Sequence, residues 1–224
     1  MDIAEKIQIY GDSIMRGILL DKEKCKYYSM PEDDLSEIRD AYSLQIVNKS
    51  RFGCTVEKGY KLLQNAIDKG LDCDMIFLEY GGNDCNFNWN EVSENPEKEH
   101  KPFTPIDLFE NLYRKIIVNL KGLGITPIIM SLPPIDAEKY FNWISQGLCK
   151  ENILSWLGDV QMIYRFQELY SSKVTQLAYE TNSPYIDIRS AFLDKHNYKK
   201  LLCDDGIHPN EAGHKLSLIH IFYR

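Results

Sequence analysis

The chain has 224 residues, of which 44% are hydrophobic and 26% charged, a composition typical of a globular protein with a substantial core. Its formal net charge of −7 disfavours nucleic acid or an anionic membrane surface as the main partner. No apolar run approaches the roughly 20 residues that a membrane-spanning helix needs. We therefore expect residues 1–224 to form one domain with no membrane span and no nucleic-acid partner, and its oligomeric state is left open.

The six cysteines are scattered along the chain and include no C-x-x-C pair. This arrangement disfavours both a structural zinc site and a disulfide framework. The first predicted strand begins within a few residues of the N-terminus, which leaves no room for a secretory signal peptide. Both features favour a cytoplasmic protein, although the trimmed form of a secreted protein would begin in the same way.

Hydrophobic periodicity divides the chain into alternating strands and helices. Strands rich in β-branched and aromatic residues are predicted at 7–10, 43–48, 74–80, 125–131 and 185–188. Helices are predicted at 14–20, at 55–69 with Thr55 as its cap, from 104 to about 122, from 159 onward and from about 210 onward. Three polar or irregular segments, residues 21–42, 85–101 and 132–158, are expected to be loops for the most part.

This alternation implies right-handed crossovers and a parallel sheet that is covered by helices on both faces. We therefore predict a three-layer α/β/α, flavodoxin-like domain with about five parallel strands. In such a sheet the carboxyl ends of the strands face one crevice, so residues far apart in sequence meet there. The last nine residues, LSLIHIFYR, are unusually apolar. They are either a docking helix or a cloning remnant, and the sequence leaves both open.

Four polar motifs stand where predicted strands end or where the last helix begins. They are Gly11-Asp12-Ser13, Gly53, Gly81-Gly82-Asn83-Asp84 and Asp205-Gly206-Ile207-His208. In this order, and over nearly the whole chain, they resemble the four sequence blocks of the SGNH hydrolases, also called the GDSL esterase/lipase family. The resemblance implies the SGNH hydrolase fold and a serine esterase that uses no metal or other cofactor.

The resemblance also implies a role for each motif, and side-chain chemistry supports these roles. Ser13 is the expected nucleophile, and it needs a base because a free hydroxyl is a weak nucleophile. His208 is the expected base because imidazole titrates near neutral pH, and Asp205 is expected to orient it. The backbone N–H groups of Ser13 and Gly53 and the side-chain amide of Asn83 form the expected oxyanion hole. A helix that starts just after Ser13 would also favour negative charge there.

Ordinary structural interpretations compete with some of these roles. Gly53 can be a simple turn at the entry to a helix, and Asn83 with Asp84 can cap a turn. Asp204 is a rival for the orienting acid, and we disfavour it because the family spacing counts back three residues from the histidine. We interpret Asp12 and Asp84 as organisers of their loops.

Two cysteines adjoin the motifs and offer alternative nucleophiles. Cys54 follows the glycine motif, and Cys85 follows the Gly81–Asp84 motif. Neither has an identifiable base partner in the sequence, so Ser13 remains the preferred nucleophile.

The substrate is inferred from the two irregular segments that should overhang the crevice. Trp89, Trp143 and Trp156 stand there among amide and charged side chains, a mixture that suits sugar rings. Neither segment has a run of Leu, Ile or Met to line a groove for a long acyl chain. We therefore expect a short acyl group, such as acetyl, on a polar or carbohydrate alcohol. The alternative for these aromatic residues is that they pack the loops onto the core.

Three other functions stay open. A lysophospholipase- or thioesterase-type lipid acylhydrolase would use the same motifs, and so would an acyltransferase, in which an alcohol replaces water. A catalytically silent or phosphate-binding domain of the same fold is the non-enzymatic alternative. The chain has neither a G-x-x-x-x-G-K-[ST] nor a G-x-G-x-x-G motif, which disfavours phosphate binding.

Overall fold

A parallel sheet of five strands forms the centre of the protein, whose computed structural model describes residues 5–30 and 44–222. The strands are β1 (Lys6–Gly11), β4 (Gln45–Asn48), β5 (Met75–Glu79), β6 (Thr126–Met130) and β7 (Tyr185–Ile186). Their order across the sheet is β4-β1-β5-β6-β7, and all neighbours are parallel. Counted within the sheet this is the flavodoxin-like order, so the predicted fold class is confirmed.

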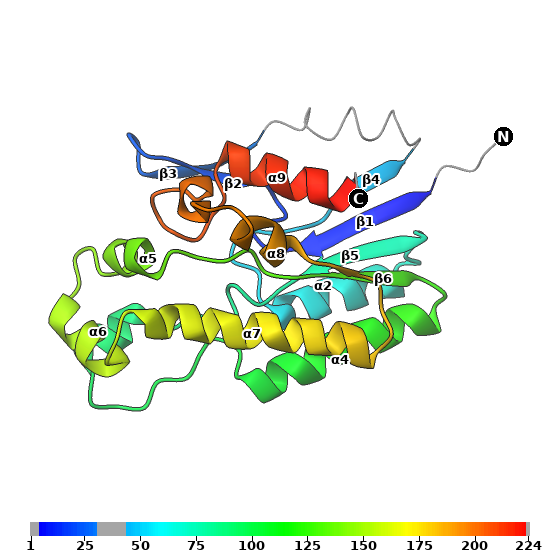
Figure 1. Ribbon diagram of the computed structural model, residues 1–224. Coiled ribbons are helices and arrows are strands. Elements are labelled where there is room, and N and C mark those ends of the chain that lie inside the picture. Colours follow the sequence, from blue (N-terminus) through cyan, green and yellow to red (C-terminus); the bar gives the residue numbers. More distant parts are fainter. Residues whose placement is uncertain (1–4, 31–43, 223–224) are drawn as a thin grey trace.

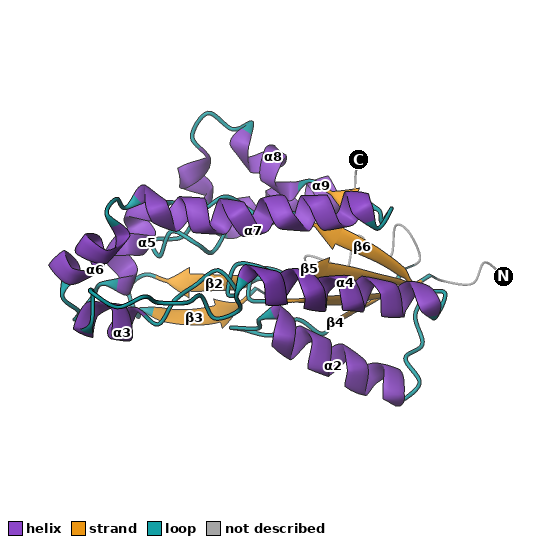
Figure 2. Ribbon diagram, turned by 90° about the horizontal axis from the view of Figure 1, so that it is seen from below, coloured by secondary structure: helices purple, strands orange, loops and turns teal. Residues whose placement is uncertain are grey.

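Helices cover both faces of this sheet, as Figures 1 and 2 show. One face packs against α2 (Val56–Asp68), α4 (Ile106–Gly122) and α7 (Gln161–Glu180), and the other against α8 (Ile188–Leu193) and α9 (Glu211–Phe222). Because successive strand residues point to opposite faces, Ile76 and Leu78 of β5 enter the first core and Phe77 enters the second.

A third group of helices lies beyond the carboxyl ends of the strands (Figure 1). It consists of α3 (Trp89–Glu94), α5 (Ala137–Ile144) and α6 (Lys150–Leu157), and a short 3-10 helix, η2 (Tyr198–Leu201), precedes the last motif. The expectation that segments 85–101 and 132–158 are loops is therefore wrong in part. These helices are too short for clear periodicity, and they bury their apolar side chains against one another and the start of α7.

The segment after Ser13 differs from the prediction. Instead of a helix at 14–20, residues 13–17 form one tight turn, in which the Arg16 N–H donates to the Asp12 carbonyl (3.1 Å). Gly17 then adopts φ +71°, and the chain continues as an antiparallel hairpin of β2 (Ile18–Asp21) and β3 (Lys26–Ser29). The left-handed glycine ends the turn before a helix can form. The rest of the expected loop, residues 31–42, lies outside the described residues.

The other predicted helices are confirmed, but the cap of α2 is not the expected one. Thr55 occupies the cap position without a side-chain hydrogen bond to the helix. The first free N–H of α2, at Val56, donates instead to the Asp84 carboxylate (2.9 and 3.2 Å). Burial raises the pKa of Asp84 to about 7, against the effect of this hydrogen bond. Asp84 therefore organises its loop as expected, by tying it to α2.

The apolar C-terminal segment forms the second half of α9. Leu216 and Ile221 pack against the core beside α8. Tyr223 and Arg224 lie outside the described residues. Within the described ranges no helix combines the length and apolar character needed to cross a bilayer. The six cysteines carry free thiols.

A buried tyrosine tests how much the packing of α4 on the sheet contributes to stability. The Tyr113 hydroxyl is buried and donates to the Leu78 carbonyl of β5 (3.1 Å). We expect Tyr113→Phe to lower the free energy of unfolding by about 1 kcal/mol, because the carbonyl loses a partner that water cannot replace. Tyr179→Phe, at a side chain that is 88% exposed, is the matched control and should change nothing measurable in urea denaturation. Equal effects of the two changes would contradict this account.

Candidate active site

Ser13, His208 and Asp205 form a continuous line of hydrogen bonds at the carboxyl edge of the sheet. Ser13 Oγ lies 2.8 Å from His208 Nε2, and His208 Nδ1 lies 2.6 Å from Asp205 Oδ2. All three residues are buried. The serine follows β1, whereas the other two residues belong to the loop before α9, so the sheet brings together residues 195 positions apart.

The loop that carries Asp205 and His208 is held by its own backbone. Asp205 Oδ1 accepts the N–H groups of Ile207 and His208 (both 3.1 Å), which fixes its carboxylate beside the imidazole. Although burial opposes ionisation, the hydrogen bonds and charge of His208 lower the pKa of Asp205 below its usual value. Gly206 has φ +77°, and a Cβ there would lie 2.6 Å from the carbonyl oxygen of Asp136. Only glycine fits this turn.

The rival residues of the sequence analysis are engaged elsewhere. Asp204 forms an exposed ion pair with Lys22 of the β2–β3 hairpin (2.8 Å), and the imidazole bonds to Asp205 instead. The thiols of Cys54 and Cys85 donate to backbone carbonyls. Burial raises the pKa of Cys54 to about 11 and raises that of Cys85 further, so neither is a thiolate at neutral pH.

The oxyanion-hole prediction concerns the backbone N–H groups of Ser13 and Gly53 and the side-chain amide of Asn83. Within the described residues, neither the Ser13 N–H nor the Gly53 N–H donates a hydrogen bond. Asn83 lines the same cavity as Ser13 and donates one of its two amide hydrogens to Asp12 Oδ2 (2.8 Å). The second amide hydrogen is then available to a substrate.

Gly53 is placed by a turn that runs alongside β1. The Arg51 N–H donates to the Gly11 carbonyl (3.1 Å), and the Cys54 N–H closes the turn on the Arg51 carbonyl (3.2 Å). Gly53 is the third residue of this turn and has φ +64°, a conformation that strongly favours glycine. Gly53 itself does not line the cavity, but its neighbour Phe52 does.

The cavity beside Ser13 has a volume of about 240 Å³ and two different walls. The outer rim is aromatic and surrounds His208. The Tyr27 ring lies 5.0 Å from the imidazole, the Phe52 ring stacks on it at 6.0 Å, and Trp143 lies 6.3 Å from Tyr27. Phe52 remains more than half exposed, so this rim faces incoming substrate.

The inner wall is apolar and is built from α5, α7 and the loop after β6. Its main side chains are those of Leu132, Pro133, Ile135, Ile144, Ile163 and Phe166. Segment 132–158 has no run of Leu, Ile or Met, yet four of its residues contribute to this apolar wall. These residues are spread along the sequence and become contiguous only when α5 packs on α7. No continuous apolar stretch of the sequence therefore predicts them.

The three tryptophans have different positions. Trp143 belongs to the rim, and the buried Trp89 lines the inner cavity while its indole donates to Asn86 (2.8 Å). Trp156 does not line the cavity. Its ring packs on Phe87 at 5.0 Å and on Phe166 at 6.2 Å, behind the inner wall. The packing alternative therefore describes Trp156.

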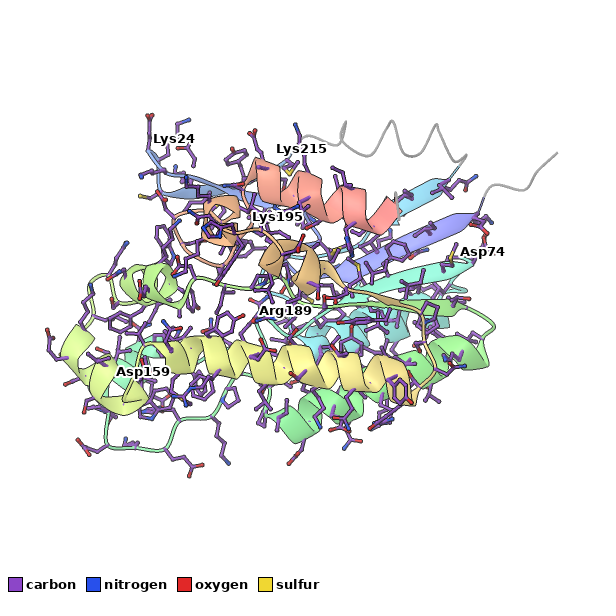
Figure 3. The ribbon with its side chains drawn as sticks, viewed as in Figure 1. Lys24, Asp74, Asp159, Arg189, Lys195 and Lys215 are labelled. Carbon is purple, nitrogen blue, oxygen red and sulfur yellow. The ribbon has the colours of Figure 1, made fainter. Side chains whose placement is uncertain are left out.

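A buried arginine supports the inner wall from behind. Arg189, labelled in Figure 3, is the second residue of α8 and reaches toward α7. Its guanidinium donates to the Leu132 carbonyl (3.2 Å), to Gln167 Oε1 (2.9 Å) and to the Glu168 carboxylate. Because Leu132 and Gln167 both line the cavity, this network fixes the shape of its base.

Comparison with known proteins assigns the chain to a family. The profile of the GDSL-like lipase/acylhydrolase family matches residues 9–216. The chain belongs to the GDSL-like lipase/acylhydrolase family. It is 24% identical over 187 residues to the GDSL esterase/lipase CPRD49 of Arabidopsis thaliana, a match that covers 81% of this chain. The match spans 66% of that curated relative's length.

Solved structures of GDSL-like proteins share the fold. An acetylxylan esterase of Geobacillus stearothermophilus, Axe2, is similar with a TM-score of 0.68 and 22% identity over 100% of this chain and 95% of that chain. A lipase/acylhydrolase of Enterococcus faecalis is similar with a TM-score of 0.66 and 19% identity over 98% and 94% of the two chains. At these identities the likeness establishes the architecture.

Sequence reasoning missed two kinds of residue in this GDSL-like site. Tyr27 and Phe52 reach His208 only through the hairpin and turn that flank β1, and no local pattern links them to it. Glu79 lines the cavity from the end of β5 and is buried. The sequence indicates it by a charged residue near the end of the otherwise apolar strand DMIFLEY, where charged residues are rarely buried.

Among the residues that the structure describes, no group of three or more His, Cys, Asp or Glu side chains is placed to hold a metal ion.

The two adjacent aspartates of the last motif provide a matched pair of variants. We expect Asp205→Asn to lower kcat for an aryl ester by about a thousandfold or more, because the amide no longer holds the imidazole in the required tautomer. Asp204→Asn should keep kcat within about twofold, since it breaks only an exposed ion pair. Steady-state kinetics on both variants checks this, and a damaging Asp204→Asn with a harmless Asp205→Asn would reverse the assignment.

Proposed function

We propose that the protein is a serine esterase that hydrolyses a carboxylic ester through an acyl-enzyme on Ser13. The observation that supports this best is the hydrogen-bonded line from Ser13 Oγ through His208 to Asp205. Membership of the GDSL-like lipase/acylhydrolase family supports the same reaction class. The substrate is then a small-molecule or carbohydrate ester, and the predicted cytoplasmic location remains a prediction.

In this mechanism Ser13 Oγ attacks the ester carbonyl while His208 Nε2 takes the hydroxyl proton. Asp205 stabilises the imidazolium that forms. The carbonyl oxygen becomes an oxyanion, and the N–H groups of Ser13 and Gly53 and the amide of Asn83 bind it. Such donors are typically worth a factor of about 10² to 10³ each in rate. The proton on His208 passes to the departing alcohol, and water attacks the acyl-enzyme by the same steps.

The nucleophile is tested by removing one hydroxyl. We expect Ser13→Ala to lower kcat by about four orders of magnitude or more and to leave the melting temperature nearly unchanged. A fluorophosphonate should label Ser13 in the wild type. Ser172→Ala, at an exposed serine of α7, is the control and should retain full activity. Labelling of Cys54 or Cys85, or substantial turnover by Ser13→Ala, would overturn the proposal.

The proposal extends to a short acyl group, such as acetyl, on a polar or carbohydrate alcohol. The aromatic rim of Tyr27, Phe52 and Trp143 supports it, because aromatic faces contact the C–H surfaces of sugar rings. The structural likeness to Axe2, an acetylxylan esterase, is consistent with the same class. Under this proposal the alcohol occupies the rim. An acceptor alcohol that replaced water there would make the protein an acyltransferase.

A second candidate follows from the inner wall of the cavity. Leu132, Ile135, Ile163 and Phe166 enclose a volume that suits an acyl chain of medium length. This is the arrangement expected of a lysophospholipase- or thioesterase-type acylhydrolase. The two candidates differ in the acyl chain that they accept, so one experiment separates them.

A series of aryl esters with acyl groups of increasing length tests which acyl chain the enzyme accepts. We expect kcat/KM to be greatest for acetyl and to fall steadily with longer chains, whereas a maximum at eight or more carbons would establish the second candidate.

A variant of the rim tests the alcohol part of the proposal. Trp143→Ala should raise KM for an acetylated sugar about tenfold and leave KM for an aryl acetate within about twofold. Equal effects on both substrates would make Trp143 a packing residue.

A further inference from the structure

A buried carboxyl group that the mechanism does not use lies beneath the oxyanion hole. Glu79, the last residue of β5, is 2% exposed, and within the described residues no side-chain N–H or hydroxyl group donates to either of its carboxyl oxygens. The groups of Asp12 are the ones that interact with it most closely. It borders both the cavity beside Ser13 and a second cavity of about 400 Å³ on the α9 face of the sheet. A buried carboxylate without donors is unstable, so Glu79 needs either a proton or a partner.

The neighbour of Glu79 is Asp12, which directly follows the residue that pairs with Glu79 in the sheet. Gly11 stands opposite Glu79 in the sheet register, and the next residue is Asp12, which is 1% exposed. Burial, and then the charge of Asp12, raise the pKa of Glu79 well above its ordinary value. Two carboxyl groups buried side by side cannot both be ionised at neutral pH, so the pair holds a proton.

The hydrogen bonds of Asp12 decide which member of the pair is ionised. Asp12 Oδ1 accepts the Ile14 N–H (2.8 Å), and Oδ2 accepts the Asn83 side-chain amide (2.8 Å). Both bonds require acceptor oxygens and favour the carboxylate form. The proton therefore resides on Glu79, whose carboxyl oxygens have no comparable pair of well-formed hydrogen bonds.

We propose that Glu79 is a positioning residue whose protonated carboxyl supports the Asp12 carboxylate, which in turn fixes the Asn83 amide in the oxyanion hole. This inference rests on the proposed function, because it assigns Asn83 to the oxyanion. With one N–H held by Asp12, the amide cannot rotate to present its oxygen, and its second N–H stays directed at the developing negative charge. Such preorganisation is the source of catalysis by oxyanion holes.

Other charged groups near the pair fit this arrangement. His208 faces Asp12 from the loop before α9, and Asp84 adds negative charge beside Glu79. Arg16 and His214 border the second cavity, and the Arg16 guanidinium donates to the Ser50 carbonyl. The ionised form of Asp84 strengthens the preference for a neutral Glu79.

Two substitutions at Glu79 distinguish the effect of its hydrogen-bond donor from the effect of its side-chain volume. Glu79→Gln keeps a neutral donor directed at Asp12, and we expect it to retain kcat within about threefold. Glu79→Met keeps the length of the side chain and removes the donor. We expect it to lower kcat by about ten- to hundredfold with KM within about threefold, because the amide is then displaced. Glu57→Gln, at an exposed carboxyl of α2, is the control and should change neither parameter.

A double-mutant cycle shows whether Glu79 acts through Asn83. Asn83→Ala removes the amide and should lower kcat by about 10² to 10³. In that background Glu79→Met should cost no more than about twofold further, because its target is absent. The same full loss from Glu79→Met in both backgrounds would overturn the proposal, since it would identify a general structural effect. Circular dichroism and melting temperature confirm that each variant is folded.

The proton itself is visible by difference infrared spectroscopy of the whole protein. At neutral pH the wild type minus Glu79→Gln spectrum should contain the carbonyl band of a protonated carboxyl group. A carboxylate band in its place would overturn the proposal. These outcomes are distinct from failure of the proposed function, in which Ser13→Ala and Asn83→Ala would retain activity whatever the result at Glu79.

Discussion

The hydrogen bond between Ser13 Oγ and His208 Nε2 is the contact on which the site depends. It joins the end of the first strand to a loop near the end of the chain, so it exists only when the whole sheet is assembled. The loop is held in reach by Gly206, whose carbonyl accepts the Asp136 N–H (2.8 Å) at the start of α5. The same helix supplies the rim and the inner wall, and folding of the cavity and alignment of the base are therefore coupled.

Negative charge is concentrated under this contact, and each acid is stabilised differently. Asp205 is ionised by its bonds to His208, whereas Asp84 accepts the first N–H of α2. Asp12 accepts two N–H groups, whereas neither carboxyl oxygen of Glu79 has a well-formed hydrogen bond. In a medium of low dielectric constant these differences decide which group carries a proton. The proposal for Glu79 uses this difference, since a neutral acid costs far less to bury than a charged one.

The cavity divides substrate recognition between two sources of side chains. Its rim comes from the β2–β3 hairpin, the turn at Phe52 and the end of α5. Its inner wall comes from α5, α7 and the loop after β6, and Arg189 of α8 bonds to the last two. Under the proposed function, the rim contacts the alcohol and the inner wall contacts the acyl group.

The sequence by itself determined the strands, the long helices and the polar motifs, because hydrophobic periodicity and turn residues act over a few neighbouring positions. Asp205 was paired with His208, in preference to the adjacent Asp204, by the motif spacing of the family that the sequence resembles. The hairpin in place of a helix after Ser13 is a local effect of the left-handed Gly17. The tertiary structure decided the contacts between distant segments: the capping of α2 by Asp84, and the apolar wall that segment 132–158 shares with α7. Both depend on a partner far along the chain, and burial against that partner outweighs local propensity.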